Sequence, residues 1–198
     1  MTRRRPRKTG YFALTGLLAL VLVSGLISLQ PYGSPLNWIT RGAALLGYLA
    51  IFLAIVSSAY MRQLVRFFGR PFVQVHHMLS VTGLILITLH PLSAAWSSTS
   101  LRVLLPRFDS WRVFLQLGGR PAWYLIAAAA LTAALRSVIG RRWRAIHLLN
   151  YVAFLLGTVH AILIGTDFQQ PVIKAVAITM AIVVIATLIQ KRFQRGRR

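Results

Sequence analysis

Apolar residues run almost without interruption through six segments of this chain. The segments cover residues 11–29, 42–60, 75–96, 122–139, 145–166 and 171–189. Each is near the roughly 20 residues that an α-helix needs to cross the hydrocarbon core of a bilayer. Apolar runs of this length predict membrane-spanning helices. We therefore expect an all-α integral membrane protein, a bundle of six transmembrane helices that forms a single domain over residues 1–198.

The composition favours the same class of protein. Apolar residues make up 57% of the chain, charged residues 13%, and Asp109 and Asp167 are the only acidic residues. A soluble domain normally carries about a quarter charged residues. The chain contains no cysteine, which excludes disulfides, iron–sulfur clusters, thiolate-bound metals and covalently attached heme. Any heme would have to be held non-covalently by other side chains.

Basic residues are divided unequally between the two sides of the predicted bundle. The net charge of +21 would suggest a nucleic-acid partner for a soluble protein. However, 17 of the 23 Lys and Arg residues lie at the termini and in alternate loops, which share one side of the predicted bundle. By the positive-inside rule this side is cytoplasmic, so the N- and C-termini are expected in the cytoplasm. We expect a multi-pass protein of the cell (inner) membrane that contacts membrane lipid and no nucleic acid.

Four of the five histidines lie at two matched depths in the third and fifth segments. His76 and His90 are 14 residues apart, and His147 and His160 are 13 apart, so the rise of a helix separates each pair by about 20 Å. Both segments run in the same direction, so His76 and His147 share the inner level and the other two share the outer level. Ionisable residues inside a span indicate function, and imidazole is an axial ligand of heme iron. The pattern predicts heme between the third and fifth helices.

The helical phase of the histidines favours some ligands over others. A step of 14 residues returns to within about 40° of the starting face, so His76, rather than its neighbour His77, shares a face with His90. The step of 13 residues from His147 to His160 leaves the two side chains about 140° apart around the helix axis. For both to face the same partner helix, that helix needs a kink, a π-bulge or a long side-chain reach. His77 stays as an alternative inner ligand, a group near the ligands or an interface residue.

Two other kinds of residue near the histidines carry alternative roles. Gly83 and Gly157 lie between the histidines of their helices, where glycine allows either the close approach of a flat macrocycle or close helix packing. Arginines flank both levels and can bind the carboxylates of heme propionates through charge-assisted hydrogen bonds. We expect such contacts from Arg70, Arg141 and Arg144, although the positive-inside rule explains the inner arginines equally well.

These features resemble the ferric-reductase-like transmembrane domain family, which includes ferric reductases, NADPH oxidases and the MsrQ-like heme-binding membrane subunit of bacterial methionine sulfoxide reductases. The resemblance rests on the four histidines and on the segment RRWRAIHLLNYVAFLLGTVH, residues 141–160. It implies a six-helix core in which paired histidines of the third and fifth helices hold b-type hemes, with the same unequal spacing. Unlike full-length oxidases and reductases, the sequence shows no flavin or nicotinamide domain, so we expect an electron-transfer subunit that needs a partner.

We therefore expect a di-heme b-type membrane cytochrome that transfers electrons across the membrane, in a ferric-reductase-like or methionine-sulfoxide-reductase-like system. Its iron ligands would be His76, His90, His147 and His160. The number of b-type hemes stays open between two, which the two levels favour, and one. The expected donor is a separate flavoprotein reductase or quinol, and the acceptor is ferric iron, oxygen or an extracytoplasmic redox enzyme. The alternative is a non-heme subunit that is structural or that transports a metal or solute through its histidines.

Overall fold

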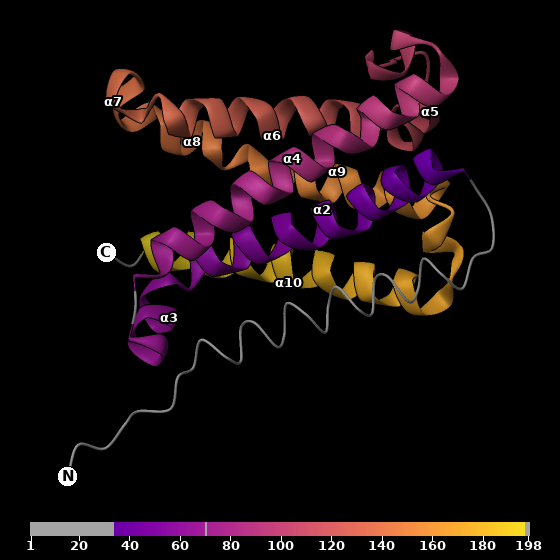
Figure 1. Cartoon of the computed structure of the whole chain (residues 1–198). Helices are drawn as coiled ribbons and strands as arrows, with labels where there is room; N and C mark the ends of the chain where they lie inside the picture. Colours follow the sequence, from indigo (N-terminus) through magenta and orange to yellow (C-terminus); the bar gives the residue numbers. More distant parts are fainter. Residues whose placement is uncertain (1–33, 70, 197–198) are drawn as a thin grey trace.

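The computed structural model describes residues 34–69 and 71–196, which form helices joined by short turns (Figure 1). The long helices of this part are α2 (Pro35–Ala59), α4 (Phe72–Ser98), α6 (Gly119–Ala134), α9 (Leu149–Ile164) and α10 (Pro171–Gly196). The shorter helices are α3 (Met61–Phe68), η1 (Leu101–Leu104), α5 (Trp111–Gln116), α7 (Arg136–Ile139), η2 (Gly140–Arg142), α8 (Trp143–His147) and η3 (Asp167–Gln169). The described residues contain no strand, so the predicted all-α class is confirmed.

Local sequence determines where several of these helices begin and end. α2 begins with Pro35, which is favoured in the first turn because the N–H that proline lacks would have no helical partner there. α3 ends at Gly69, whose φ of 67° lies in the left-handed region that glycine adopts easily. α5 follows Ser110, whose side chain accepts a hydrogen bond from the N–H of Val113. These signals fix the turns at the two ends of the bundle.

α2 and α4 run antiparallel and pack closely along most of their length (Figure 1). Two glycines allow this approach. A Cβ atom added to Gly47 would lie 2.8 Å from Ile87 Cγ2, and one added to Gly83 would lie 2.7 Å from Ile51 Cδ1. A larger residue at either position would therefore push the isoleucine aside. Of the two roles that the sequence left open for Gly83, the structure shows helix packing.

The other long helices complete a core around α2. In Figure 1, α10 passes on one side of α2, and α6 and α9 lie on the other side. The main buried cluster draws on all four of these helices and consists of Ile51, Ile55, Ala122, Ile126, Ala153, Phe154 and Val184. A second cluster consists of Leu45, Phe168, Ile173 and Ala177. The small alanines allow close helix contact, which drives association of helices in lipid.

Three described helices are long and apolar enough to cross a membrane, namely Pro35–Ala59, Phe72–Ser98 and Pro171–Phe193. α6 and the segment Arg136–His147, bent by 77° relative to each other, would add a fourth if they form one broken span. α9 is also apolar but has only 16 residues. The first predicted segment, 11–29, lies outside the described residues, so the count of six spans stays a prediction.

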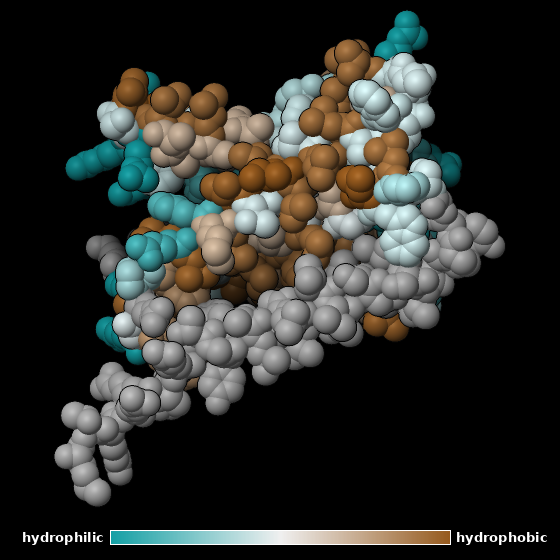
Figure 2. All heavy atoms as spheres, viewed as in Figure 1, coloured by the Kyte–Doolittle hydropathy of each residue, from teal (hydrophilic) through white to brown (hydrophobic). Residues whose placement is uncertain are grey.

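Large apolar side chains cover much of the outer surface of the helices (Figure 2). Val81, Ile85 and Ile182 are 57%, 60% and 60% exposed, respectively. Soluble proteins rarely expose contiguous apolar surface of this extent, whereas lipid-facing helices require it. The chain is a multi-pass membrane protein.

The observed helix bounds differ from the predicted ones in three ways. α2 begins at Pro35, well before the predicted start at residue 42, and α10 continues to Gly196, past the predicted end at residue 189. The fourth and fifth predicted segments are both divided, at Leu135 and at Leu148. Between them the chain turns at Gly140, which has a φ of 64°, and passes through a run of basic residues that would be costly inside lipid.

Candidate functional site

The structure places the four paired histidines at two levels of the bundle. At one level, His76 on α4 and His147 on α8 have ring centroids 6.4 Å apart and ring planes at 77°. At the other level, His90 on α4 and His160 on α9 each have Nδ1 against a backbone carbonyl. We call the end of the bundle with α3, α7 and α8 the inner end, and the end with η1, α5 and η3 the outer end, after the predicted orientation (Figure 1). The role of these pairs as ligands stays a prediction.

Two of the three histidines of α4, His76 and His90, contact backbone carbonyls of α2. The Nδ1 atom of His76 lies 3.0 Å from the oxygen of Ala54, and that of His90 lies 3.0 Å from the oxygen of Thr40. A carbonyl oxygen can only accept a hydrogen bond, so Nδ1 carries the proton and donates. The neutral ring then keeps the lone pair of Nε2 free. Thr40 and Ala54 are 14 residues apart, the same interval as their histidines.

The histidines of α8 and α9 contact carbonyls of the preceding helices in a corresponding way. The Nδ1 atom of His160 lies 2.6 Å from the oxygen of Gln116, the last residue of α5. The Nδ1 atom of His147 makes longer contacts, 3.4 Å from the oxygen of Ala129 and 3.4 Å from Nδ2 of Asn150. Gln116 and Ala129 are 13 residues apart, again the interval of their histidines. Each histidine-bearing segment therefore lies against a scaffold with acceptors at the same spacing.

A break in the helix separates His147 from His160. α8 ends at His147, and α9 begins at Leu149. At the break, Leu148 N–H donates to the oxygen of Ala145, and Tyr151 N–H donates to the oxygen of Leu148, so both bonds span three residues instead of four. This tighter turn changes the direction in which the side chains after it point around the helix axis. It lies between His147 and most of α9, in the segment where a regular helix would place His147 and His160 on different faces.

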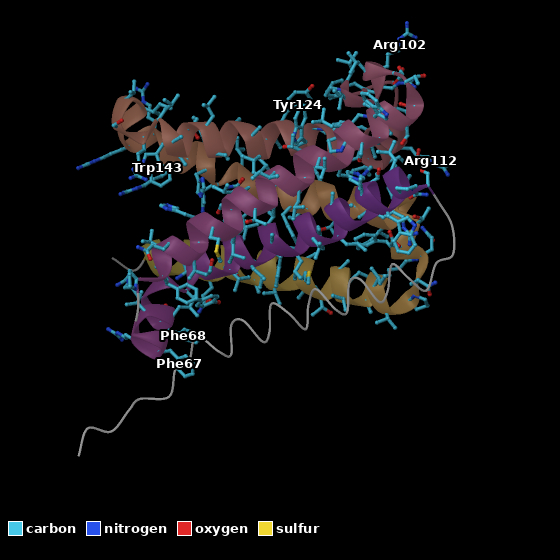
Figure 3. The ribbon with its side chains drawn as sticks, viewed as in Figure 1. Phe67, Phe68, Arg102, Arg112, Tyr124 and Trp143 are labelled. Atoms are coloured by element: carbon cyan, nitrogen blue, oxygen red, sulfur yellow. The ribbon has the colours of Figure 1, made fainter. Side chains whose placement is uncertain are left out.

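A cavity of about 1380 Å³ lies beside the inner histidine pair. This volume exceeds the roughly 300–1,000 Å³ of most small-molecule sites. His76, His77 and His147 line the cavity, as does Trp143 of α8, which is labelled in Figure 3. Apolar walls come from the long helices and include Ile51, Ala54, Leu84, Ile126 and Ala130. The cavity can hold a large, mainly apolar group next to two imidazoles.

Cationic side chains from several elements also line this cavity. They are Arg62, Arg66, Arg136, Lys191 and Arg192. No Asp or Glu of the described residues lines it, and Figure 2 shows hydrophilic side chains gathered at this end of the molecule. Such a set favours a bound group that carries carboxylates or phosphates at one edge.

Two glycines, Gly157 of α9 and Gly119 at the start of α6, describe the space near His160. A Cβ atom added to Gly157 would meet no described atom within 4 Å, so open space lies beside it. A Cβ atom added to Gly119 would lie 2.7 Å from Cδ2 and 2.8 Å from Nε2 of His160. The outer imidazole therefore packs against the backbone at the start of α6. Gly119 was not among the residues predicted for the site, and the adjacent glycines Gly118 and Gly119 are the one signal for it in the sequence.

The chain matches no model of a known protein family and no solved structure. It is 32% identical over 157 residues to the protein-methionine-sulfoxide reductase heme-binding subunit MsrQ of Azospira oryzae. The matched region covers 77% of this chain. The chain belongs to the MsrQ-like, ferric-reductase-like family. The resemblance inferred from the histidines and the segment 141–160 is thereby confirmed, and the match spans 66% of the length of the MsrQ relative.

In this MsrQ-like chain, one of the other residues predicted for the site lines the cavity, two do not, and one lies outside the described residues. His77 lines it, with its ring centroid 5.9 Å from that of His76. Arg141 and Arg144 are not among the described residues that line it, and Arg70 lies outside the described residues. Their contacts with propionates stay a prediction. Of the five cations that line the cavity, Arg66 is one of the arginines that flank the inner level in the sequence, and the other four are alternatives that the sequence pattern did not single out.

Proposed function

We propose that this chain is a heme-binding membrane subunit of a redox system, which carries electrons between the two faces of the membrane. The observation that carries the proposal is the arrangement of the inner pair. Two imidazoles, from helices far apart in the sequence, face each other beside a large, cation-lined cavity. The name of the MsrQ relative, a heme-binding subunit of a reductase, supports the same function.

The inner donor set fits a heme iron. Two imidazoles that bind one metal ion can have ring centres up to about 6 Å apart, with about 2 Å for each metal–nitrogen bond and about 1 Å from each nitrogen to its ring centre. The observed separation of 6.4 Å agrees with this value. The Nδ1 atom of His76 donates to the carbonyl of Ala54, and in a neutral imidazole with the proton on Nδ1 the other nitrogen, Nε2, is free to bind a metal. Such bonds orient histidine ligands and raise their basicity.

The residues around the inner pair would each have a defined task. His76 and His147 would hold the iron through their imidazole nitrogens. The apolar walls would exclude water and lower the local dielectric, and the five cations would neutralise carboxylates at the edge of the bound group. Heme, when bound, supplies an iron that takes up and releases one electron at a time.

The outer pair supports a second site of the same type. His90 and His160 repeat the Nδ1 bonding to carbonyls, and they lie about 20 Å along the helices from the inner pair. Between the two levels, Tyr48 and Phe154 stack with ring centroids 4.7 Å apart. Phe154 is seven residues after His147 and six before His160. In the two-heme form of the proposal, this aromatic stack fills the space between the sites.

The partners of such a subunit follow from its orientation. We infer cytoplasmic N- and C-termini from the distribution of Lys and Arg. The inner pair would then receive electrons from a flavoprotein reductase or a quinol, and the outer pair would pass them to ferric iron, oxygen or an extracytoplasmic redox enzyme. The name of the MsrQ relative favours the redox enzyme among these acceptors.

The visible spectrum of the protein purified from membranes tests the proposal. We expect a Soret band and, after reduction with dithionite, the sharp α-band of low-spin heme with two imidazole ligands. Protein expressed with sufficient heme supply that shows neither band would refute the proposal. That result would instead favour the alternative of a non-heme structural or transport subunit.

A further inference from the structure

The two acidic residues of this chain are both paired with arginine, in very different surroundings. Asp109 binds Arg107, two residues away in the same loop, and their side chains are 52% and 59% exposed. Asp167 binds Arg41, 126 residues away, and their side chains are 7% and 10% exposed. The Nε atom of Arg41 lies 3.1 Å from both carboxylate oxygens, and a terminal nitrogen also contacts Oδ1. A buried pair of this kind is costly to break, because the remaining partner would be an unpaired buried charge.

The buried pair joins the segments that carry the outer histidines. Arg41 follows Thr40, whose carbonyl accepts the hydrogen bond from His90. The side chain of Thr40 lies 2.8 Å from Oγ of Ser93, which in turn donates to the carbonyl of His90. One turn of α2 thus contacts His90 in two ways, through the carbonyl of Thr40 at the imidazole and through the side chains of Thr40 and Ser93 at the backbone carbonyl.

The other end of the pair is connected to His160. Asp167 is the first residue of η3, which directly follows α9. His160 lies in the last two turns of α9, and Gly165 N–H continues the helical bonding by donating to the oxygen of Ala161. The Arg41–Asp167 pair therefore connects the turn of α2 that holds His90 to the end of the helix that carries His160.

We propose that Arg41 and Asp167 are a positioning pair that sets the separation and orientation of His90 and His160. The two ligands come from α4 and α9, and their spacing depends on how firmly both helices are held to α2. The description of the two histidines as heme ligands rests on the proposed function, whereas the mechanical role of the pair does not. The exposed Arg107–Asp109 pair, within one loop, holds no two helices together.

The bundle should still fold without the pair, because apolar contacts join the same elements. Leu45 of α2 packs with Phe168 of η3 and with Ile173 and Ala177 of α10. The Tyr48 ring also meets the Phe168 ring edge-on, with centroids 5.8 Å apart. A substitution that removes only the charges is therefore a fair test of positioning.

The distance between the outer ends of α4 and α9 tests the proposal in heme-free protein. Because the chain has no cysteine, spin labels can be attached at Leu92→Cys and Leu163→Cys, which replace residues that are each 46% exposed. We expect one narrow distance distribution in the parent and in the matched control Asp109→Asn. Asp167→Asn should broaden or shift it. An unchanged distribution in Asp167→Asn, or equal broadening in both variants, would overturn the proposal.

Two further measurements separate loss of positioning from misfolding and from the absence of heme. The double variant Arg41→Gln/Asp167→Asn leaves no lone buried charge, so it serves if Asp167→Asn does not fold, and the same broadening is expected. In heme-loaded protein, Asp167→Asn should shift the midpoint potential of the outer heme and leave that of the inner heme unchanged. A parent protein that binds no heme would refute the proposed function, while the label distances would still decide the role of the pair.

Discussion

Each paired histidine has its Nδ1 atom near a backbone carbonyl. The carbonyl oxygen lies 2.6–3.0 Å from Nδ1 of His76, His90 and His160, and 3.4 Å from Nδ1 of His147, where Nδ2 of Asn150 lies equally close. In the three shorter contacts Nδ1–H donates to the carbonyl, so Nε2 is the atom that would bind a metal in the proposed function. Backbone carbonyls have no side-chain identity, so no sequence pattern could have revealed these acceptors. The histidines were predictable because helical rise converts their spacing directly into depth.

His76 and His77 should differ sharply as ligands. His76 bonds to the carbonyl of Ala54 and faces His147, whereas His77 makes no such carbonyl bond within the described part of the chain. We expect His76→Ala to lose the inner heme in a pyridine hemochrome assay, and His77→Ala to retain both hemes with at most a shifted potential. The opposite pattern would show that His77 is the ligand.

Substitution of Gly157 by alanine should have opposite effects on the heme-free and on the heme-bound protein. Alanine in place of glycine inside a helix stabilises it by about 0.5–1 kcal/mol, and open space lies beside this residue. We expect Gly157→Ala to raise the melting temperature of heme-free protein but to lower its heme content, because the methyl group would enter the space of the macrocycle. Unchanged heme content would mean that no macrocycle lies against this residue.

At the scale of helices, the sequence predicted the long apolar elements better than the broken ones. α2, α4 and α10 contain the continuous apolar runs of the sequence. A run of this length in lipid forms a spanning helix, because its backbone polar groups must find their hydrogen-bond partners within the segment. The region from α6 to α9 is divided where basic residues and Gly140 interrupt the pattern, and hydropathy alone does not locate such breaks. The break at Leu148 falls where the 13-residue step between His147 and His160 required a departure from regular helix.

The junction of α5 and α6 should control the outer site. Gly119 lies against the ring of His160, and the carbonyl of Gln116 binds its Nδ1 atom. We expect Gly119→Ala to displace this ring and to lower the heme content, with the inner heme retained as an internal control. Separate redox titration of the two hemes would measure the effect. Equal loss of both hemes would point to a general folding defect instead.

At the scale of the whole molecule, the distribution of basic residues predicts the orientation in the membrane, on which the proposed direction of electron flow depends. The asymmetry of Lys and Arg predicts that a reporter fused after Arg198 is active only in the cytoplasm, and that one inserted near Ser100 is active only outside. Alkaline phosphatase and green fluorescent protein fusions measure this in intact cells. The reversed pattern would place the cation-lined cavity on the outer side and invert the proposed direction.

In the proposed function, two levels of histidine pairs hold heme. The ratio of heme to protein, measured by pyridine hemochrome assay in the parent and in the variants His147→Ala and His160→Ala, tests this arrangement. We expect two hemes in the parent and loss of about half the heme in each variant, because each removes a ligand from one level only. Full heme content in both variants would contradict it, and complete loss in both would reduce the two sites to one.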